Sequence, residues 1–184
     1  MHFRPYTIAL AVIYSLLLPI VYFFDPSLFD YSVRAEYLPI AVAILFASAL
    51  SLYVACRVMR DTTTQARSRP SVRSIALALG YIAMISIAEE LLFRGIIQGY
   101  FQTVIANTVL VVLFSSLLFG VAHLPNDAKG IHPLRWNWRL AGIAFLGGIP
   151  LGALYALTGS LLFPILLHAI FLLILKFTTP QFFQ

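Results

Sequence analysis

Long apolar runs separated by short polar segments dominate the chain. A helix that crosses a bilayer needs ~20 mainly apolar residues. Six runs meet or nearly meet that length, at residues 6–24, 37–56, 74–99, 104–123, 140–158 and 160–178. Only a few residues around Gly159 separate the last two runs, which predicts a tight helical hairpin. The pattern therefore predicts an all-α, polytopic membrane helix bundle of about six transmembrane helices.

The composition agrees with a membrane protein. Of the 184 residues, 61% are hydrophobic and 10% are charged, and the mean hydropathy is +0.92. A soluble globular domain has about 25% charged residues. The first run is longer than the apolar region of a signal peptide and no small-x-small cleavage site follows it, so it is interpreted as a retained helix. We expect one integral membrane domain over residues 1–184.

The basic residues indicate an orientation in the membrane rather than a nucleic-acid partner. The net charge is +5, but the Lys and Arg residues fall in the segments between apolar runs. If both termini are cytoplasmic, ten of the twelve lie on the cytoplasmic side, and only Arg34 and Arg94 do not. The positive-inside rule therefore predicts a chain with its N-terminus and C-terminus both inside.

Five ionisable residues interrupt the apolar runs. Glu89, Glu90 and Arg94 lie in the third run, His123 ends the fourth, and His168 lies within the sixth. A charged side chain at the centre of a bilayer costs about 2.5–3.5 kcal/mol on insertion scales, and such residues usually mark a function. Taken singly, they also have structural interpretations. In these interpretations Glu90 and Arg94, four residues apart on one helix face, neutralise each other and help to hold neighbouring helices together. His168 would then be a residue that forms a hydrogen bond between helices.

Taken together, the five residues indicate a reaction site. If Arg94 neutralises Glu90, then Glu89 has no partner on its own helix, because it lies about 100° around the helix from Glu90. A buried carboxylate of this kind is a candidate general base. His123 and His168, from two other helices, would complete a group that activates water and stabilises an oxyanion. Spacing alone leaves open which of the two glutamates is the base.

The predicted spans put two of these residues at different depths. Glu89 lies ~22 Å along the third span at ~1.5 Å per residue, whereas His123 ends the inward-running fourth span. The resulting offset is on the order of 10 Å. Helix tilt, an extended third helix or an inverted orientation is needed to remove it. The side of the membrane from which the site opens stays undecided at this point.

The fifth run carries a short helix-packing pattern. Gly148 and Gly152 form a small-xxx-small motif, which lets a second helix approach closely. Pro150 lies between the two glycines and is also able to kink the helix. The expected role of this segment is packing.

Three motifs resemble those of a known protease family. Glu89-Glu90-Leu-Leu-Phe-Arg94 matches EExxxR, Phe119-Gly-Val-Ala-His123 matches FxxxH, and His168 begins the third motif, HxxxN, within GSLLFPILLH. The sequence is similar to the CPBP family of CAAX proteases and bacteriocin-processing enzymes, also called the Abi family. The resemblance covers about residues 75–175. It implies a four-helix catalytic core at 74–178, preceded by two accessory helices and a basic loop at 1–73.

The resemblance implies a glutamate-dependent intramembrane endopeptidase. In that family's pattern Glu89 deprotonates water with help from His123, Glu90 and Arg94 support them, and His168 stabilises the oxyanion. One position departs from the pattern, because Leu172 stands where the family usually has an Asn that helps to hold the oxyanion. Leucine donates no hydrogen bond, so His168 acts alone, or another donor such as Ser115 or Ser116 assists it, or the activity is altered.

Other functions are compatible with the same residues. Glu89, His123 and His168 have the ligand types of a catalytic His₂Glu zinc site, although no HExxH motif is present and the preferred interpretation needs no metal. A non-catalytic immunity or membrane partner protein and a proton- or ion-translocating protein are the alternatives to a protease. For the protease, the expected substrate is a membrane-anchored protein or peptide. The expected location is the bacterial inner membrane.

Overall fold

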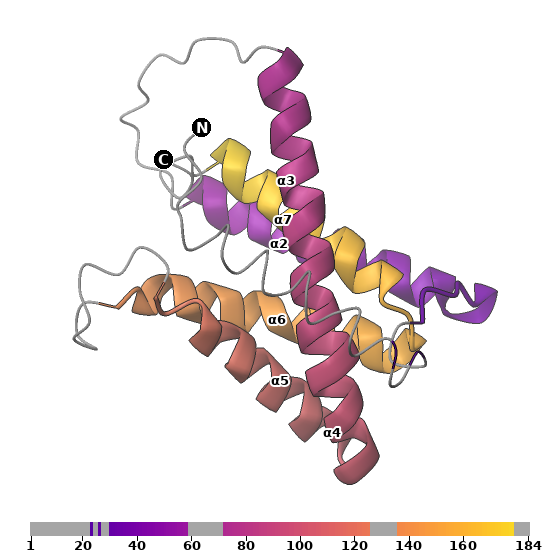
Figure 1. The fold of residues 1–184 in the computed structure, drawn as a ribbon. Helices are drawn as coiled ribbons and strands as arrows, with labels where there is room; N and C mark the ends of the chain where they lie inside the picture. The colour runs from indigo at the N-terminus through magenta and orange to yellow at the C-terminus, as the bar shows by residue number, and fades with distance from the viewer. Residues whose placement is uncertain (1–22, 24–25, 27–29, 59–71, 126–135, 179–184) are drawn as a thin grey trace.

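The computed structural model describes residues 23, 26, 30–58, 72–125 and 136–178, which contain helices and no strand (Figure 1). The predicted all-α fold is confirmed. After the 3₁₀ turn η2 (Ala35–Tyr37), the helices are α2 (Leu38–Val58), α3 (Val72–Glu90), η3 (Leu91–Gln98), α4 (Gly99–Val104), α5 (Thr108–Ala122), α6 (Trp138–Thr158) and α7 (Leu162–Thr178). The first predicted span, 6–24, lies outside the described residues except for Phe23.

Three of the described helices are long and apolar enough to cross a membrane, namely Ala35–Arg57, Ile75–Val104 and Trp138–Thr158. Two shorter apolar helices, α5 and α7, accompany them. Large apolar side chains point outward, including Phe46 at 70%, Val109 at 66% and Leu146 at 65% exposure. An apolar exterior of this extent is suited to lipid. The chain is an integral membrane protein.

The third predicted span is part of a longer continuous helix. α3, η3 and α4 follow one another without a break from Val72 to Val104, so the helix is ~50 Å long at ~1.5 Å per residue. This helix crosses the other helices in Figure 1 and its N-terminal end projects beyond them. Its middle section, η3, is a π-helix, in which the backbone bonds to the fifth residue along instead of the fourth. Asn107 caps the start of α5 after a three-residue turn.

The α6–α7 hairpin expected around Gly159 is present. α6 ends at Thr158, and Gly159 takes the left-handed conformation (φ 69°) that glycine adopts without steric cost. The backbone N–H of Leu161 then donates to the Asp30 carbonyl at 2.7 Å, tying the start of α7 to the segment before α2. Nearby, the backbone N–H of Ser32 donates to the Asp30 carboxylate at 2.7 Å, which lowers the pKa of Asp30.

Among the described residues three apolar clusters hold the bundle together, and two of them span three helices each. One joins α2, α6 and α7, and its members are Ala41, Leu151, Leu154, Phe163, Leu167 and Phe171. The second joins η3, α5 and α6 through Phe93, Phe119 and Ala144. The polar residues described next lie beside this second cluster.

Candidate active site

Glu89 and Glu90 are the last two residues of α3, immediately before the π-helix. Because they are adjacent on a helix, their side chains leave it in different directions. Glu90 is fully buried, whereas 20% of the Glu89 side chain is exposed. The two carboxylates therefore have different surroundings, one enclosed by protein and one partly open.

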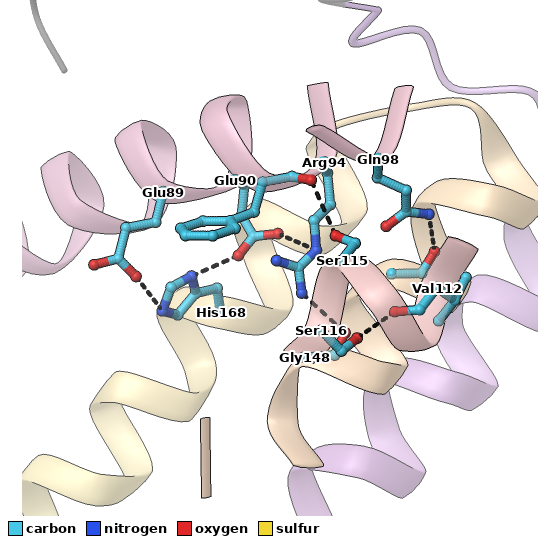
Figure 2. Close-up of polar contacts among 11 residues, drawn as sticks. Glu89, Glu90, Arg94, Gln98, Val112, Ser115, Ser116, Gly148 and His168 are labelled. Carbon is cyan, nitrogen blue, oxygen red and sulfur yellow. Dashed lines mark hydrogen bonds and ion pairs between the residues drawn. The ribbon is translucent and has the colours of Figure 1, made fainter. Parts of the chain in front are cut away.

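Glu90 is held on both of its oxygens (Figure 2). Arg94 Nε lies 3.2 Å from Oε2 in the i, i+4 ion pair expected from the spacing. On the other oxygen, His168 Nδ1–H donates to Oε1 at 2.8 Å. Glu90 thus neutralises Arg94 and at the same time orients an imidazole from α7.

Arg94 is fully buried and is bound by more than its ion pair. Its Nη2 donates to the Gly148 carbonyl of α6 at 2.9 Å. Its guanidinium carbon lies 4.9 Å from the centre of the Phe119 ring, within the range of a cation–π contact. These contacts fix Arg94, and with it Glu90, against α5 and α6.

Glu89 faces two imidazoles without a hydrogen bond to either. Its Oε2 lies 3.9 Å from His123 Nε2 and 3.7 Å from His168 Nε2. Both distances exceed that of a hydrogen bond. Among the described residues, Glu89 Oε2 has no hydrogen-bond partner although it is buried. It is therefore an acceptor that the surrounding protein leaves unused, between two nitrogen atoms.

His123 and Phe119 are joined by the FxxxH spacing. The Nδ1–H of His123 donates to the Phe119 carbonyl at 2.8 Å, so the neutral ring presents its Nε2 lone pair toward Glu89. The Phe119 ring makes edge contacts with three other rings, those of Phe93, His123 and His168, at centroid distances of 5.0, 4.6 and 5.6 Å. Phe119 is thus the packing centre of the site.

The depth offset expected from the predicted spans is absent. The third helix runs on to Val104 instead of ending at residue 99, and α5 turns back beside it. Glu89 precedes the end of α4 by fifteen residues, and His123 follows the start of α5 by the same number. The two arms have equal length, so His123 returns to the level of Glu89. Of the explanations considered, the extended helix accounts for the contact.

The chain matches the model of a known family. The model of the Rce1-like type II CAAX prenyl endopeptidase family matches residues 71–174, which is more than half of the chain and includes the five ionisable residues of the site. The chain belongs to this family. No curated protein and no solved structure matches the sequence significantly.

Membership of the Rce1-like family identifies the chain as a membrane-embedded protease at the level of the family. The match contains α3 to α7 except for the last residues of α7, and it excludes α2. Glu89, Glu90, Arg94, His123 and His168 all lie inside it, and the structure brings all five together.

The two serines considered as substitutes for the missing Asn of an Rce1-like site are occupied. The Ser115 hydroxyl donates to the Phe93 carbonyl at 3.1 Å, and the Ser116 hydroxyl donates to the Val112 carbonyl at 2.7 Å. A serine has one hydroxyl proton. In this structure both hydroxyl protons therefore bond helix carbonyls and neither serine donates to the region of His168.

Sequence reasoning missed Gln98 and underestimated Gly148. Gln98 is fully buried, and its amide donates to the Gly152 carbonyl at 2.8 Å. Gly148 and Gly152 do form a packing face, as expected, but their carbonyls also accept the two side-chain hydrogen bonds from η3. The sequence did carry a signal for Gln98, because it is a polar residue within an apolar run, eight positions after Glu90.

Proposed function

We propose that this chain hydrolyses a peptide bond in a membrane-associated protein or peptide, with Glu89 as the general base that activates water. One observation carries the assignment to Glu89 rather than Glu90. The Glu89 side chain is partly exposed, and its Oε2 has no hydrogen bond and lies 3.7 Å or more from both imidazoles. Glu90 is fully buried, accepts a hydrogen bond from His168 on Oε1 and is ion-paired with Arg94 Nε at 3.2 Å on Oε2. A general base needs a free acceptor within reach of the water that it deprotonates.

The hydrogen-bond directions support water binding at this point. His123 donates from Nδ1 to Phe119, so its Nε2 is an acceptor in the neutral ring. Glu89 Oε2 is also an acceptor and lies 3.9 Å from that nitrogen. A water molecule has two protons, so one molecule beside both atoms donates to each of them. Its lone pairs then point away from the two acceptors, toward a bound peptide.

His168 is the proposed donor to the oxyanion. Its Nδ1–H is committed to Glu90, so its Nε2 must carry a second proton to donate, and the ring then acts as an imidazolium. The carboxylates of Glu89 and Glu90 on either side favour this charge. Arg94 balances Glu90 and keeps that carboxylate ionised. A preoriented charged donor of this kind is worth more in a buried site than in water.

In the proposed reaction, water adds to the carbonyl group of the peptide bond, and the carbon–nitrogen bond then breaks. The water oxygen bonds to the carbonyl carbon while one water proton passes to Glu89, and the carbonyl oxygen takes the negative charge beside His168. When the oxyanion collapses, the carbon–nitrogen bond breaks. The proton on Glu89 passes to the leaving nitrogen, directly or through His123. The products are a carboxylic acid and an amine, and Glu89 returns to its starting state.

The substrate class follows from the position of the site in an apolar bundle. A C-terminal tail, a leader or a sorting signal that lies in the membrane reaches Glu89 without leaving the bilayer. The matched family is described as acting on CAAX prenyl proteins. A prenylated C-terminal tail is therefore the first reporter to test, and a tail anchored by an apolar peptide segment is the second.

The ends of the helices support the proposed orientation. Arg57 lies in the last turn of α2, Lys176 in the last turn of α7, and Arg139 near the start of α6. Asp30 lies at the other end, beside the α6–α7 connection. With the basic end in the cytoplasm, both termini are inside, in what we propose is the bacterial inner membrane. Residues 74–178 would form the catalytic core of one membrane domain, with 1–73 as its accessory part.

Leu172 supports a second candidate, a non-catalytic membrane partner protein. It lies one turn after His168, where an amide would assist an oxyanion, and leucine does not. A protein that only binds a partner has no need for that donor. Retention of the biological function in a Glu89/His123 double variant would select this candidate over the protease.

The deciding experiment measures cleavage by the purified full-length protein in lipid bilayers. The reporters are a fluorogenic peptide with a farnesylated CAAX terminus and one with an apolar transmembrane tail. The proposal predicts that the wild type cleaves one of them and that Glu89→Gln does not. Full activity in Glu89→Gln overturns the role of Glu89. Failure of the wild type to cleave either reporter, in a folded preparation, favours the binding protein.

A further inference from the structure

Four fully buried polar side chains recur at every fourth residue along the long helix. They are Ser86, Glu90, Arg94 and Gln98. Glu90 contacts α7 through His168, whereas Arg94 and Gln98 contact α6 (Figure 2). Glu90 and Arg94 belong to the proposed catalytic arrangement, but Gln98 lies two turns away from Glu90. The proposed chemistry gives Gln98 no direct part.

Arg94 and Gln98 bind α6 in matching register. Arg94 Nη2 donates to the Gly148 carbonyl at 2.9 Å, and Gln98 Nε2 donates to the Gly152 carbonyl at 2.8 Å. Donors four residues apart on one helix thus meet acceptors four residues apart on the other. A side chain that donates to a carbonyl inside a helix must approach the helix backbone closely, and both acceptors are glycines. The two bonds form one attachment between the helices.

The glycines leave just enough room for this attachment. A Cβ atom added to Gly152 would lie 2.9 Å from Gln98 Oε1 and 3.1 Å from a methyl carbon of Val112. One added to Gly148 would lie 3.0 Å from Ser116 Cβ and 3.2 Å from Ser116 Cα. The Gln98 amide therefore lies against the bare backbone of α6, and any side chain at residue 152 pushes against it.

The π-helix keeps the two donors on one side. In an α-helix, four residues turn by about 400°, so a residue eight positions on lies about 80° around from the first. The wider turn of a π-helix takes more residues, so Gln98 lies at a different angle from Glu90 than an α-helix would give. In this geometry η3, which spans Leu91–Gln98, presents both Arg94 and Gln98 to α6 while Glu90 faces His168 of α7. A helix bound only at Arg94 would be free to take the commoner α-helical turn and rotate Glu90 away from His168.

We propose that Gln98 is a positioning residue, which fixes the turn of η3 on α6 and thereby keeps Arg94, Glu90 and His168 in line. This inference rests on the proposed function, since it explains how the proposed donor His168 is held. Gln98 acts through Arg94 and touches neither the water nor the substrate. Its loss therefore slows the chemical step and leaves substrate binding nearly unchanged.

The test replaces Gln98 with methionine, which keeps the unbranched shape and removes the hydrogen bond. The expected result is a kcat about 10- to 100-fold lower with KM within about twofold, because small misplacements of catalytic groups have effects of this size. Gln102→Met is the matched control, since Gln102 lies one turn further along α4 and is partly exposed. A kcat equal to that of the wild type in folded Gln98→Met overturns the proposal.

A double-variant cycle separates positioning from general loss of stability. Lysine at residue 94 keeps the charge but lacks the planar fork that binds Glu90 and Gly148 together. If Gln98 acts through Arg94, then Gln98→Met costs less than about threefold in kcat in the Arg94→Lys background. If Gln98→Met lowers kcat by the same factor in the wild type and in Arg94→Lys, the positioning role is contradicted.

A second variant reaches the same contact from α6 and covers the case in which Gln98→Met does not fold. Gly152→Ala displaces the Gln98 amide, the end of a flexible side chain, and should lower kcat to a similar extent. Gly142→Ala is its control, because a Cβ atom at Gly142 meets nothing within 4 Å. Wild-type kcat in Gly152→Ala overturns the proposal. Glu89→Gln, assayed in parallel, separates the outcomes, because full activity there overturns the proposed function instead.

Discussion

His168 Nδ1 and Glu90 Oε1 are 2.8 Å apart and join two helices that lie 78 residues apart in the sequence. This bond gives Glu90 a task beyond neutralising Arg94. A buried carboxylate that orients an imidazole, which in turn faces the reacting group, is the arrangement that activates histidines in many hydrolases. The EExxxR motif therefore supplies two carboxylates with different proposed roles: Glu89 is the general base, and Glu90 orients His168.

The two glutamates should respond differently to neutralisation. Glu89→Gln removes the general base and should lower kcat by a factor on the order of 10² to 10⁴ without unfolding the protein. Glu90→Gln leaves Arg94 buried without its counter-ion, which costs about 3–5 kcal/mol. We expect that variant to lose both activity and thermal stability. Cleavage assays with thermal unfolding in detergent distinguish the two, and Glu36→Gln, on the exposed η2 turn, is the control.

His123→Ala should lower activity while leaving the fold intact. Its ring is hydrogen-bonded to the end of its own helix, at the Phe119 carbonyl, and is 16% exposed. A general acid–base residue contributes about 10²- to 10⁴-fold. The measurement is kcat in bilayers together with the unfolding temperature. A loss of activity that merely follows a loss of folded protein would contradict the proposed role.

Leu172→Asn should raise the activity of the protein. An amide one turn after His168 would add a donor for the oxyanion, and removal of one such donor elsewhere costs about 10²- to 10³-fold in kcat. We expect an increase of about tenfold in kcat, because the surrounding side chains are not arranged for an amide. Leu173→Asn adds the same polar group at the neighbouring, similarly exposed position. An equal change of kcat in Leu172→Asn and Leu173→Asn would contradict a specific role of residue 172 in stabilising the oxyanion.

Gly148→Ala should destabilise the bundle more than Gly142→Ala, on the same helix. The new methyl group at residue 148 would lie 3.0 Å from Ser116 Cβ, whereas the one at residue 142 meets nothing within 4 Å. Overpacking of this kind costs about 1–3 kcal/mol. In contrast, an unhindered Gly→Ala change in a helix stabilises by about 0.4–1 kcal/mol. Unfolding by denaturant in mixed micelles measures the free energy of unfolding of both variants. Equal values would show that α5 moves away from α6 at little cost and would contradict the prediction.

Chelation tests the zinc alternative. Each histidine is tied at Nδ1, which leaves Nε2 toward Glu89, but within the described segments no three His, Cys, Asp or Glu side chains are grouped as metal ligands. We propose a reaction that needs no metal. Cleavage should therefore persist after dialysis against a strong chelator, with the residual metal measured by mass spectrometry. Loss of activity that zinc restores would favour the His₂Glu site.

The fold was predictable from sequence because bilayer-spanning helices have a strong apolar signal. Of the five predicted spans that fall on described residues, each corresponds to a helix. The Glu90–Arg94 pair was also predictable, because an i, i+4 spacing fixes the distance between side chains. His168 as a partner of Glu90 was not, since that contact depends on how two distant helices pack.

The remaining differences have a local cause. The third span was predicted to end at residue 99 and the fourth to begin at 104, whereas the helix continues to Val104 and α5 begins at Thr108. These shifts of five and four residues together produced the expected depth offset between Glu89 and His123. The π-helix has no distinct pattern of apolar residues, so it was not anticipated. The importance of Gln98 depends on it and was missed for the same reason.

The equal arms on either side of the turn at residues 105–107 limit how this protein can change in length. Deleting one residue from either arm would rotate one side of the pair by about 100° and move it ~1.5 Å along the axis, separating Glu89 from His123. A deletion is tolerated only when a matching one occurs in the other arm. Relatives that keep both motifs should therefore vary in length mainly outside the stretch from EExxxR to FxxxH, and any change of helix length inside it should occur in both arms.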